Sequence, residues 1–264
     1  MGKTAFLFAG QGAQYTGMGK ELCEISKEAA QVFATADKIR PQTSLQCFEG
    51  SGELLAQTEN TQPCVYCTDL AAAMALQQAG IEAQGVAGFS LGEVAALTFA
   101  QTFDQQQGME LVCHRARWMQ QCAEESRAGM LVVLKLSQEQ VEQLCGQFSQ
   151  VYPVNYNCPG QLVIAGEKAA LAEAIENCKA AGARRALPLA VSGAFHTPLM
   201  AKAAAELRAY VADFTFSAPK MDIYSNLDGK VYDCSDLPAH LEQHMISPVR
   251  WTQLVKNGMA AGLT

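Results

Sequence analysis

Apolar positions along the chain fall into short continuous runs and into longer runs with helical spacing. A short continuous run predicts a buried strand, whereas apolar residues that recur every three to four positions predict a helix. This pattern predicts strands at residues 4–8 and 85–88. It predicts helical structure after Met18 and over residues 62–78, 93–100 and 104–124. Strands that alternate with helices are typical of an α/β fold.

The order of the predicted elements changes near residue 126. The following strands are predicted at residues 130–136, 151–156, 161–165 and 184–189, and the helices between them at residues 137–148 and 168–181. This β-α-β-β-α-β order is that of the ferredoxin-like split unit. The α/β pattern returns after it. We therefore predict a core formed by residues 1–125 and 192–264, with an inserted subdomain over residues 126–191.

Composition and charge exclude several functional classes. The chain has 264 residues, of which 49% are hydrophobic and 17% charged, as in ordinary globular proteins. Its net charge of −7 argues against nucleic-acid binding. The sequence contains no stretch of 18 apolar residues, the length that a membrane-spanning helix needs. The apolar run at residues 4–8 is too short for the hydrophobic part of a secretory signal. We expect a monomeric cytoplasmic protein.

Ten cysteines are scattered singly through the predicted elements, which favours reduced, buried thiols. Cys64 and Cys67 form a C-x-x-C pair, which is found in redox sites and as half of a zinc site. The alternative is two core residues near the start of a helix. We prefer this alternative and predict no metal site, because no second pair completes a set of ligands.

The run Gly88-Phe89-Ser90-Leu91-Gly92 lies between a predicted strand and a predicted helix. A G-x-S-x-G run in this position forms a nucleophile elbow, where a strained turn exposes the serine hydroxyl and the next amide stabilises an oxyanion. A glycine-rich turn with a structural serine is the alternative. We predict that Ser90 is a nucleophile that carries an acyl group.

A serine nucleophile needs a base, and the chain has four histidines. His196 follows a predicted strand in a loop, where catalytic groups concentrate. For His240 and His244, which lie in a polar helix near the end, a solvated face is the default expectation. The order serine, acid, histidine would require an acid between Ser90 and His196, and the sequence offers no comfortable one. We therefore predict a dyad.

Six motifs in order resemble the malonyl-CoA:acyl carrier protein transacylase family, whose fold also forms the acyltransferase domains of polyketide synthases. The resemblance covers essentially the whole chain. It implies an α/β-hydrolase-like core with an inserted ferredoxin-like subdomain. The motifs are Gly10-Gln11-Gly12-Ala13-Gln14, Gly88-Phe89-Ser90-Leu91-Gly92-Glu93, Arg115-x-x-x-Met119-Gln120, Asn157-Cys158-Pro159-Gly160-Gln161, Gly193-Ala194-Phe195-His196 and Ser247-Pro248-Val249-Arg250-Trp251.

The resemblance also implies a role for each site residue. Ser90 takes the malonyl group from malonyl-CoA as an ester, and His196 accepts the serine proton and later activates the phosphopantetheine thiol of acyl carrier protein. The backbone amides of Gln11 and Leu91 form the oxyanion hole. Arg115 holds the malonyl carboxylate, a task that suits a bidentate guanidinium. The alternative for Arg115 is a surface arginine of a helix. No bound cofactor is implied.

Three departures from the family stand out. Phe89 occupies a position where members often have histidine. His244 stands where many members have a glutamine whose backbone carbonyl orients the catalytic histidine. A backbone role tolerates this change, so His244 remains a candidate to orient His196. Members also continue beyond the position of Thr264, so we expect either a truncated chain or an end that is supplied otherwise.

The carrier protein of this family is acidic, so a transacylase with a net charge of −7 needs a local basic surface. Solvated surface charges are the alternative reading of the candidate residues. A serine thioesterase or esterase, an inactive binding homologue, and an acyltransferase acting in trans for a polyketide synthase are the rival functions. The candidates for the basic surface are Lys179, Arg184, Arg185 and Lys202.

Overall fold

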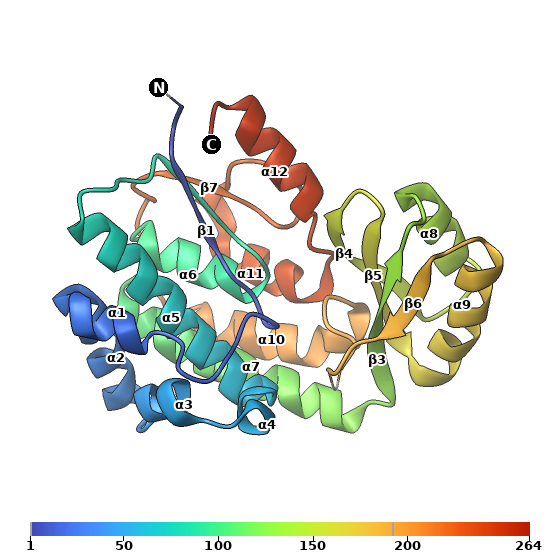
Figure 1. Ribbon diagram of the computed structural model, residues 1–264, viewed down its shortest axis with the longest axis horizontal. Coiled ribbons are helices and arrows are strands. Elements are labelled where there is room, and N and C mark those ends of the chain that lie inside the picture. Colours follow the sequence, from blue (N-terminus) through green and yellow to red (C-terminus); the bar gives the residue numbers. More distant parts are fainter. Residues whose placement is uncertain (1, 192) are drawn as a thin grey trace.

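The computed structural model describes residues 2–191 and 193–264, which form a larger and a smaller part (Figure 1). The larger part is built on a parallel sheet whose strands have the order β1-β2-β7. These strands are β1 (Ala5–Phe8), β2 (Gly85–Gly88) and β7 (Asp222–Tyr224). The central strand, β2, is buried along its whole length. It leads directly into the turn at Ser90.

Helices surround this parallel sheet and bury its central strand (Figure 1). The amino-terminal helices are α1 (Lys20–Ile25), α2 (Lys27–Ile39), α3 (Thr43–Glu49), α4 (Gly52–Leu55) and α5 (Thr58–Gln78). They are followed by α6 (Leu91–Phe99), α7 (Gln105–Glu125), α10 (Ala201–Val211), α11 (Leu237–Ile246) and α12 (Trp251–Ala260). Two short 3-10 turns lie at Pro198–Met200 and Cys234–Asp236. The predicted α/β fold is confirmed.

The smaller part contains a separate antiparallel sheet with the strand order β4-β5-β3-β6. Its strands are β3 (Ala128–Leu134), β4 (Val151–Cys158), β5 (Gln161–Glu167) and β6 (Arg185–Pro188), and its helices are α8 (Gln138–Cys145) and α9 (Lys168–Ala180). The helices pack on one face over their own apolar cluster. Met130 and Val163 on the sheet belong to the main core instead. The sheet therefore joins the two parts.

Several predicted boundaries needed correction. The helical pattern after Met18 forms two helices, because Ser26 adopts an extended conformation and caps α2 with its side chain. Helix α5 begins at Thr58 rather than at residue 62, and Pro63 lies inside it. Cys64 and Cys67 are buried core residues of this helix with free thiols, as preferred. Within residues 2–191 and 193–264 no group of three or more metal-ligating side chains is found.

The two glycines of the elbow allow the parallel sheet and α6 to approach each other closely. A Cβ atom at Gly88 would lie 1.8 Å from the carbonyl carbon of Gly92. A Cβ atom at Gly92 would lie 2.3 Å from the carbonyl oxygen of Phe8 on β1. A side chain at either position would therefore push the helix off the sheet. No described helix is both long enough and apolar enough to cross a membrane.

Candidate active site

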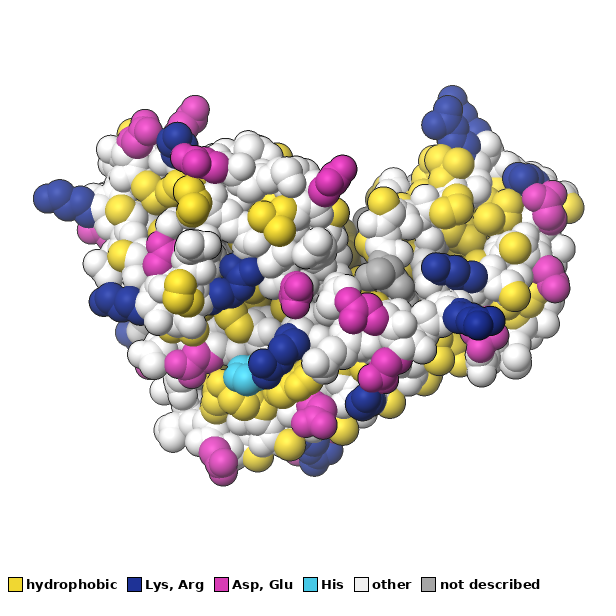
Figure 2. Space-filling model, turned by 90° about the horizontal axis from the view of Figure 1, so that it is seen from below, with side chains coloured by type: hydrophobic (Ala, Val, Ile, Leu, Met, Phe, Trp, Pro, Cys, Tyr) yellow, Lys and Arg dark blue, Asp and Glu magenta, His cyan; other side chains and the backbone are white. Residues whose placement is uncertain are grey.

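A small cavity of about 80 Å³ lies between the two parts of the molecule. Ser90 and Arg115 line it from the larger part, and Met130 and Leu189 line it from the side of the smaller sheet. The space-filling view shows a notch between the two parts (Figure 2). Five of the other nine lining residues are apolar, and the small volume of the cavity leaves little room for water beside the polar groups.

Ser90 sits in the turn between β2 and α6 with φ 52° and ψ −106°. A positive φ is uncommon for a residue with a side chain, and such strain clusters at functional sites. The Ser90 Oγ lies 2.7 Å from Nε2 of His196. The preceding residue, Phe89, packs its ring edge-on against Trp251 at 5.5 Å. The strained turn therefore presents the hydroxyl to the predicted base.

His196 is buried, and its other ring nitrogen, Nδ1, faces backbone carbonyls. Nδ1 lies 3.0 Å from the oxygen of His244 and 3.2 Å from that of Ser247. Because a carbonyl can only accept, Nδ1 carries the proton and donates it. Nε2 is then an acceptor for the Ser90 hydroxyl. The carbonyls thus set the tautomer that a general base requires.

The electrostatic surroundings of His196 keep its ring neutral. Its pKa is lowered to about 3, chiefly by burial and also by the nearby His244 and Arg115, while the two carbonyls oppose this shift. Within the described part of the chain, the histidine rings that lie within 4.0 Å of a carboxylate are those of His240 and His244, not that of His196. The geometry therefore corresponds to a dyad.

Arg115 lies on α7 and is 1% exposed. One guanidinium nitrogen is 3.3 Å from Ser90 Oγ, and another donates to the side-chain oxygen of Gln62 on α5. Among the described residues no carboxylate lies within ion-pair distance of Arg115. Burial lowers its pKa to about 10, so it stays charged at neutral pH. A buried cation with neutral partners is a strong site for an anion.

Gln11 and Leu91 line the same cavity. Leu91 is the first residue of α6, where a backbone N–H has no acceptor inside the helix. The structure thus gathers the predicted nucleophile, base, guanidinium and oxyanion residues around one cavity. His244 contributes its backbone carbonyl from α11, the position at which the family's glutamine was expected to act.

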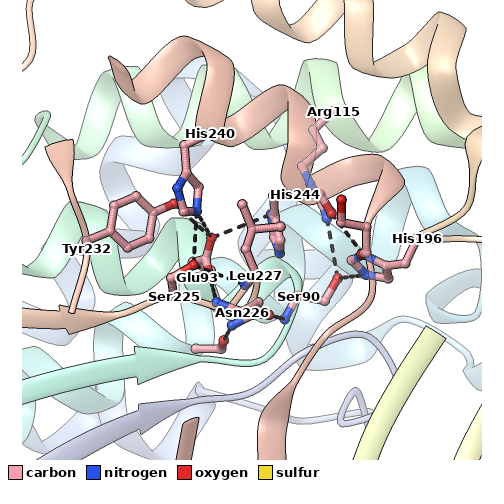
Figure 3. A network of polar contacts seen from close by, with 12 residues as sticks. Ser90, Glu93, Arg115, His196, Ser225, Asn226, Leu227, Tyr232, His240 and His244 are labelled. Carbon is pink, nitrogen blue, oxygen red and sulfur yellow. Dashed lines mark hydrogen bonds and ion pairs between the residues drawn. The ribbon is translucent and has the colours of Figure 1, made fainter. Parts of the chain in front are cut away.

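Sequence reasoning missed Gln62, Glu93 and Asn226. Asn226 follows β7 and bonds to the backbone of the elbow, and Glu93 lies in the first turn of α6 with its carboxylate fully buried (Figure 3). Glu93 and Asn226 each had a signal in the sequence, whereas Gln62 had none. Glu93 is the one charged residue of the apolar run Leu91–Phe99. Asn226 stands just beyond the carboxyl end of a parallel strand, where α/β proteins place ligand-binding groups.

The expected solvated positions of His240 and His244 are wrong. His244 is 1% exposed, and the His240 ring lies 3.2 Å from the Ser225 hydroxyl and 3.5 Å from the Glu93 carboxylate. Their helix, α11, packs against α10 and the 3-10 turn at Pro198–Met200, so these faces point inward. The two histidines of α11 therefore face the buried carboxylate of Glu93 rather than solvent.

The four candidate basic residues have different surroundings. Lys179 pairs with Glu176 at 2.7 Å, and Lys202 pairs with Glu125 at 3.0 Å. Arg184 and Arg185 line a surface hollow together with Lys135. Within the described residues none of these three cations forms an ion pair.

Comparison with known proteins adds a family to this geometry. The model of the acyl transferase domain family matches residues 5–263. A malonyl CoA-acyl carrier protein transacylase of Bacillus subtilis is 34% identical over all of this chain and 85% of its own length. The crystal structure of such a transacylase from Clostridium perfringens is 34% identical, has a TM-score of 0.94 and is aligned over 99% of this chain and 84% of its own.

A third similar protein was solved with a partner. It is a malonyl-transacylase in complex with a type II polyketide synthase acyl carrier protein. It is 36% identical to this chain, with a TM-score of 0.94 over 99% of this chain and 86% of its own. These likenesses extend over the parallel sheet, the antiparallel sheet and the cavity between them.

Proposed function

The chain belongs to the acyl transferase domain family, and on this premise we propose that it moves a malonyl group from malonyl-CoA to the phosphopantetheine thiol of acyl carrier protein. The observation that carries this proposal is the buried guanidinium of Arg115, 3.3 Å from the Ser90 hydroxyl. A cation beside the nucleophile selects an acyl group that ends in a carboxylate. An ordinary esterase has no need of this cation.

In the first half-reaction, Ser90 Oγ attacks the thioester carbonyl of malonyl-CoA while Nε2 of His196 takes the hydroxyl proton. The backbone amides of Leu91 and Gln11 stabilise the oxyanion of the tetrahedral intermediate. The C–S bond then breaks, and His196 returns the proton to the departing CoA sulfur. The products are the malonyl ester of Ser90 and free CoA.

The second half-reaction runs the same steps with the carrier thiol as the nucleophile. His196 takes the thiol proton, the sulfur attacks the ester carbonyl, and the Ser90 oxygen leaves and recovers the proton. Hydrolysis competes at this stage, and the small, largely apolar cavity leaves little room for an attacking water. All groups in this scheme are supplied by the chain, so we propose that no cofactor takes part.

The malonyl carboxylate accepts two parallel hydrogen bonds from Arg115 in this scheme. An acetyl group has no carboxylate and would leave the guanidinium buried beside neutral partners. Rejection of acetyl then follows from an unsatisfied charge rather than from size, which is the stronger form of discrimination. The hydrogen bond that Arg115 donates to the Gln62 side-chain oxygen supports this role, because it fixes the direction of the guanidinium.

The proposal is tested by the intact mass of the protein after incubation with malonyl-CoA. We expect a single malonyl adduct on the wild-type protein and none on Ser90→Ala. A folded wild-type protein without an adduct would contradict the proposal. An adduct that forms but is lost rapidly to water without a thiol acceptor would instead support a thioesterase.

We further propose that the core is α/β-hydrolase-like, formed by residues 1–125 and 192–264, and that residues 126–191 form a ferredoxin-like subdomain. The β4-β5-β3-β6 order of the antiparallel sheet supports the second description, because it places the first and third strands of the unit at the centre. The parallel strands and the elbow after β2 support the first.

We propose that the acidic carrier protein docks on the hollow lined by Lys135, Arg184 and Arg185. Met130 on β3 lines the catalytic cavity, and Lys135 lies five residues further along the chain, roughly 17 Å away at the rise of a strand. A long prosthetic arm can cover such a span. Whether the carrier serves fatty acids or polyketides is decided by comparing kcat/KM for the two kinds of carrier.

A further inference from the structure

The turn that carries Ser90 is held from a distant loop by Asn226. The Asn226 side-chain oxygen accepts from the backbone N–H of Ser90 at 2.7 Å. Its side-chain nitrogen donates to the carbonyl of Gly88 at 2.6 Å. Because one partner is a donor and the other an acceptor, the amide fits in one orientation. Asn226 is fully buried, so both bonds are shielded from water.

Glu93 holds Asn226 in turn (Figure 3). One carboxylate oxygen accepts from the Asn226 backbone N–H at 2.6 Å, and the other accepts from the Tyr232 hydroxyl at 2.8 Å. The rings of His240 and His244 face the second oxygen at 3.5 and 3.8 Å. Although burial alone would raise the pKa of Glu93, His244, His240 and the Asn226 N–H lower it to about 2. The carboxylate is therefore ionised and fully satisfied as an acceptor.

Ser90 and Glu93 occupy the two positions of a capping box, the N-cap and the third residue of α6. In a closed box, the serine oxygen accepts from the backbone N–H of the glutamate and the carboxylate accepts from that of the serine. The boxes at Asp104 and Ser137 in this protein are closed in this way. At Ser90 the side chain makes no capping bond. Both the Ser90 N–H and the Glu93 carboxylate are engaged by Asn226 instead.

We propose that Asn226 and Glu93 are positioning residues that keep this capping box open, so that the Ser90 hydroxyl faces His196 and not the end of α6. The inference rests on the proposed function, to which it adds two residues. Without Asn226, the Ser90 N–H is free to donate to the carboxylate of Glu93. The turn is then free to relax from φ 52° toward the extended conformation of Asp104 and Ser137, in which the side-chain oxygen caps the helix. Because the Ser90 N–H is occupied, the amide that the elbow offers to an oxyanion is that of Leu91.

The test measures how fast Ser90 reacts with a small alkyl fluorophosphonate, which bonds to the serine oxygen and releases fluoride. We expect Asn226→Ala to react roughly a hundredfold more slowly than wild type, because a misplacement of about 1 Å has this effect on a reaction rate. We expect a similar fall in the rate of malonyl adduct formation, seen in kcat and not in the KM for malonyl-CoA. Wild-type reactivity in folded Asn226→Ala would overturn the inference.

Two further variants separate positioning from general stability. Thr98→Val removes a buried 3.0 Å hydrogen bond to Tyr66 at the other end of α6, so it lowers stability without touching the elbow. We expect its labelling rate to stay within about threefold of wild type. Equal losses in Thr98→Val and Asn226→Ala would assign the effect to stability and overturn the inference.

Glu93→Gln keeps one oxygen as an acceptor for Asn226, so it should lose less than tenfold in labelling rate. A loss as large as that of Asn226→Ala would show that the charge acts directly and would contradict positioning. If Asn226→Ala does not fold, the criterion for Glu93→Gln is absolute: a loss of about a hundredfold or more in folded Glu93→Gln would contradict the inference. If wild-type Ser90 reacts with the fluorophosphonate but not with malonyl-CoA, the proposed function fails while the positioning inference stands.

Discussion

The charges at the centre of the site are carried by single residues that do not touch one another. Arg115 and Glu93 are both fully buried, and each is bonded to neutral groups within the described chain. The charge of Glu93 still raises the pKa of Arg115 against the effect of burial. The cation therefore stays charged without a carboxylate occupying its face toward Ser90. That face is where the proposed substrate presents its own carboxylate.

Replacing Arg115 tests this arrangement. We expect Arg115→Ala to lower kcat/KM for malonyl-CoA by roughly a hundredfold or more, while slow transfer from acetyl-CoA is unchanged or faster. The ratio of the two kcat/KM values measures the change. Arg115→Lys should recover little of the malonyl preference, because an ammonium cannot form the paired bonds of a guanidinium. An unchanged ratio in Arg115→Ala would place the selectivity elsewhere.

Residues that carry local motifs were predictable, whereas residues that act through distant contacts were not. Ser90 lies in a short signature, and His196 and Arg115 lie in motifs that identify the family. Asn226 acts across 136 positions of the chain, and no periodicity or spacing links it to Ser90. Glu93 is visible in the sequence as a charge in an apolar helix. Its partner Asn226 is not visible in this way, because the contact depends on how β7 pairs with β2 in the folded sheet.

At the scale of elements, α7 carries Arg115 into the cavity. The helix begins with a closed capping box between Asp104 and Gln107, and Arg115 follows about three turns later. Gly108, at the start of the helix, lies so close to Tyr66 that a Cβ atom there would be 2.1 Å from its hydroxyl. The position of the guanidinium is thus set by the packing of α7 on α5.

The N-cap at Asp104 should affect the stability of α7 and not the selectivity that Arg115 provides. We expect Asp104→Ala to lower the free energy of unfolding by about 1 kcal/mol, as is usual for the loss of an N-cap side chain. Urea unfolding measures this loss. The ratio of malonyl to acetyl transfer should not change, because the packing of α7 on α5 remains. A changed ratio would show that the cap also controls the placement of Arg115.

Element boundaries were harder to predict than element types. Ser26 reads as a tolerable residue inside a helical pattern, yet its hydroxyl caps α2 and also donates to Gln78 on α5 at 2.5 Å. Pro63 reads as a helix start, yet α5 begins five residues earlier. The boundary at Ser26 coincides with a contact between two elements, which the local sequence does not show. The strand before Ser90 was predicted correctly, because the continuous run of small apolar residues at 85–88 indicates a buried strand.

At the scale of the whole molecule, an acidic protein presents a basic hollow. The hollow lies on the smaller part, and none of its three cations is neutralised by an ion pair within the described chain. Lys179 and Lys202, also candidates by sequence, are paired with glutamates. The cations of the hollow thus differ from these two lysines in having no ion pair within the described chain. This difference depends on the fold and cannot be read from composition.

Charge reversal tests the hollow. We expect Arg184→Glu combined with Arg185→Glu to reduce kcat/KM for the acyl carrier protein by tenfold or more at low salt, and the deficit should shrink as salt is added. Malonyl adduct formation from malonyl-CoA should stay within about threefold. The matched control reverses Lys27 and Lys38, two exposed residues on α2 in the larger part. An equal loss of kcat/KM in the control would show that the net charge of the protein, and not the hollow, causes the effect.

Acid should destabilise the folded protein through its buried imidazoles. Burial lowers the pKa of His196 to about 3 and that of His244 to about 4, below the ordinary value near 6.5. As the pH falls, the unfolded chain therefore binds these protons before the folded protein does. The free energy of unfolding keeps its full value above pH 6.5 and decreases toward pH 4. Each proton contributes a slope of about 1.4 kcal/mol per pH unit.

His244→Gln should remove one proton from this slope. We expect urea unfolding between pH 6 and pH 4.5 to show a weaker pH dependence in the variant, by about 1.4 kcal/mol per pH unit. The backbone carbonyl that faces His196 is kept. Thr98→Val, which changes no titratable group, should be less stable with the wild-type slope. An unchanged slope in His244→Gln would mean that its ring is accessible to protons in the folded state.

The distance in sequence between Ser90 and its partners has a consequence for the time at which the protein becomes reactive. Asn226, which holds the elbow, and the carbonyl of His244, which sets the tautomer of His196, follow the serine by well over a hundred residues. A ribosome that adds 5–20 residues per second needs about 8–30 s for the roughly 150 residues from Ser90 to His244. During synthesis, Ser90 therefore emerges before the residues that activate it. We expect a chain that stops short of residue 226 to react slowly with thioesters, because it lacks the bond that holds the elbow and the carbonyl that orients His196.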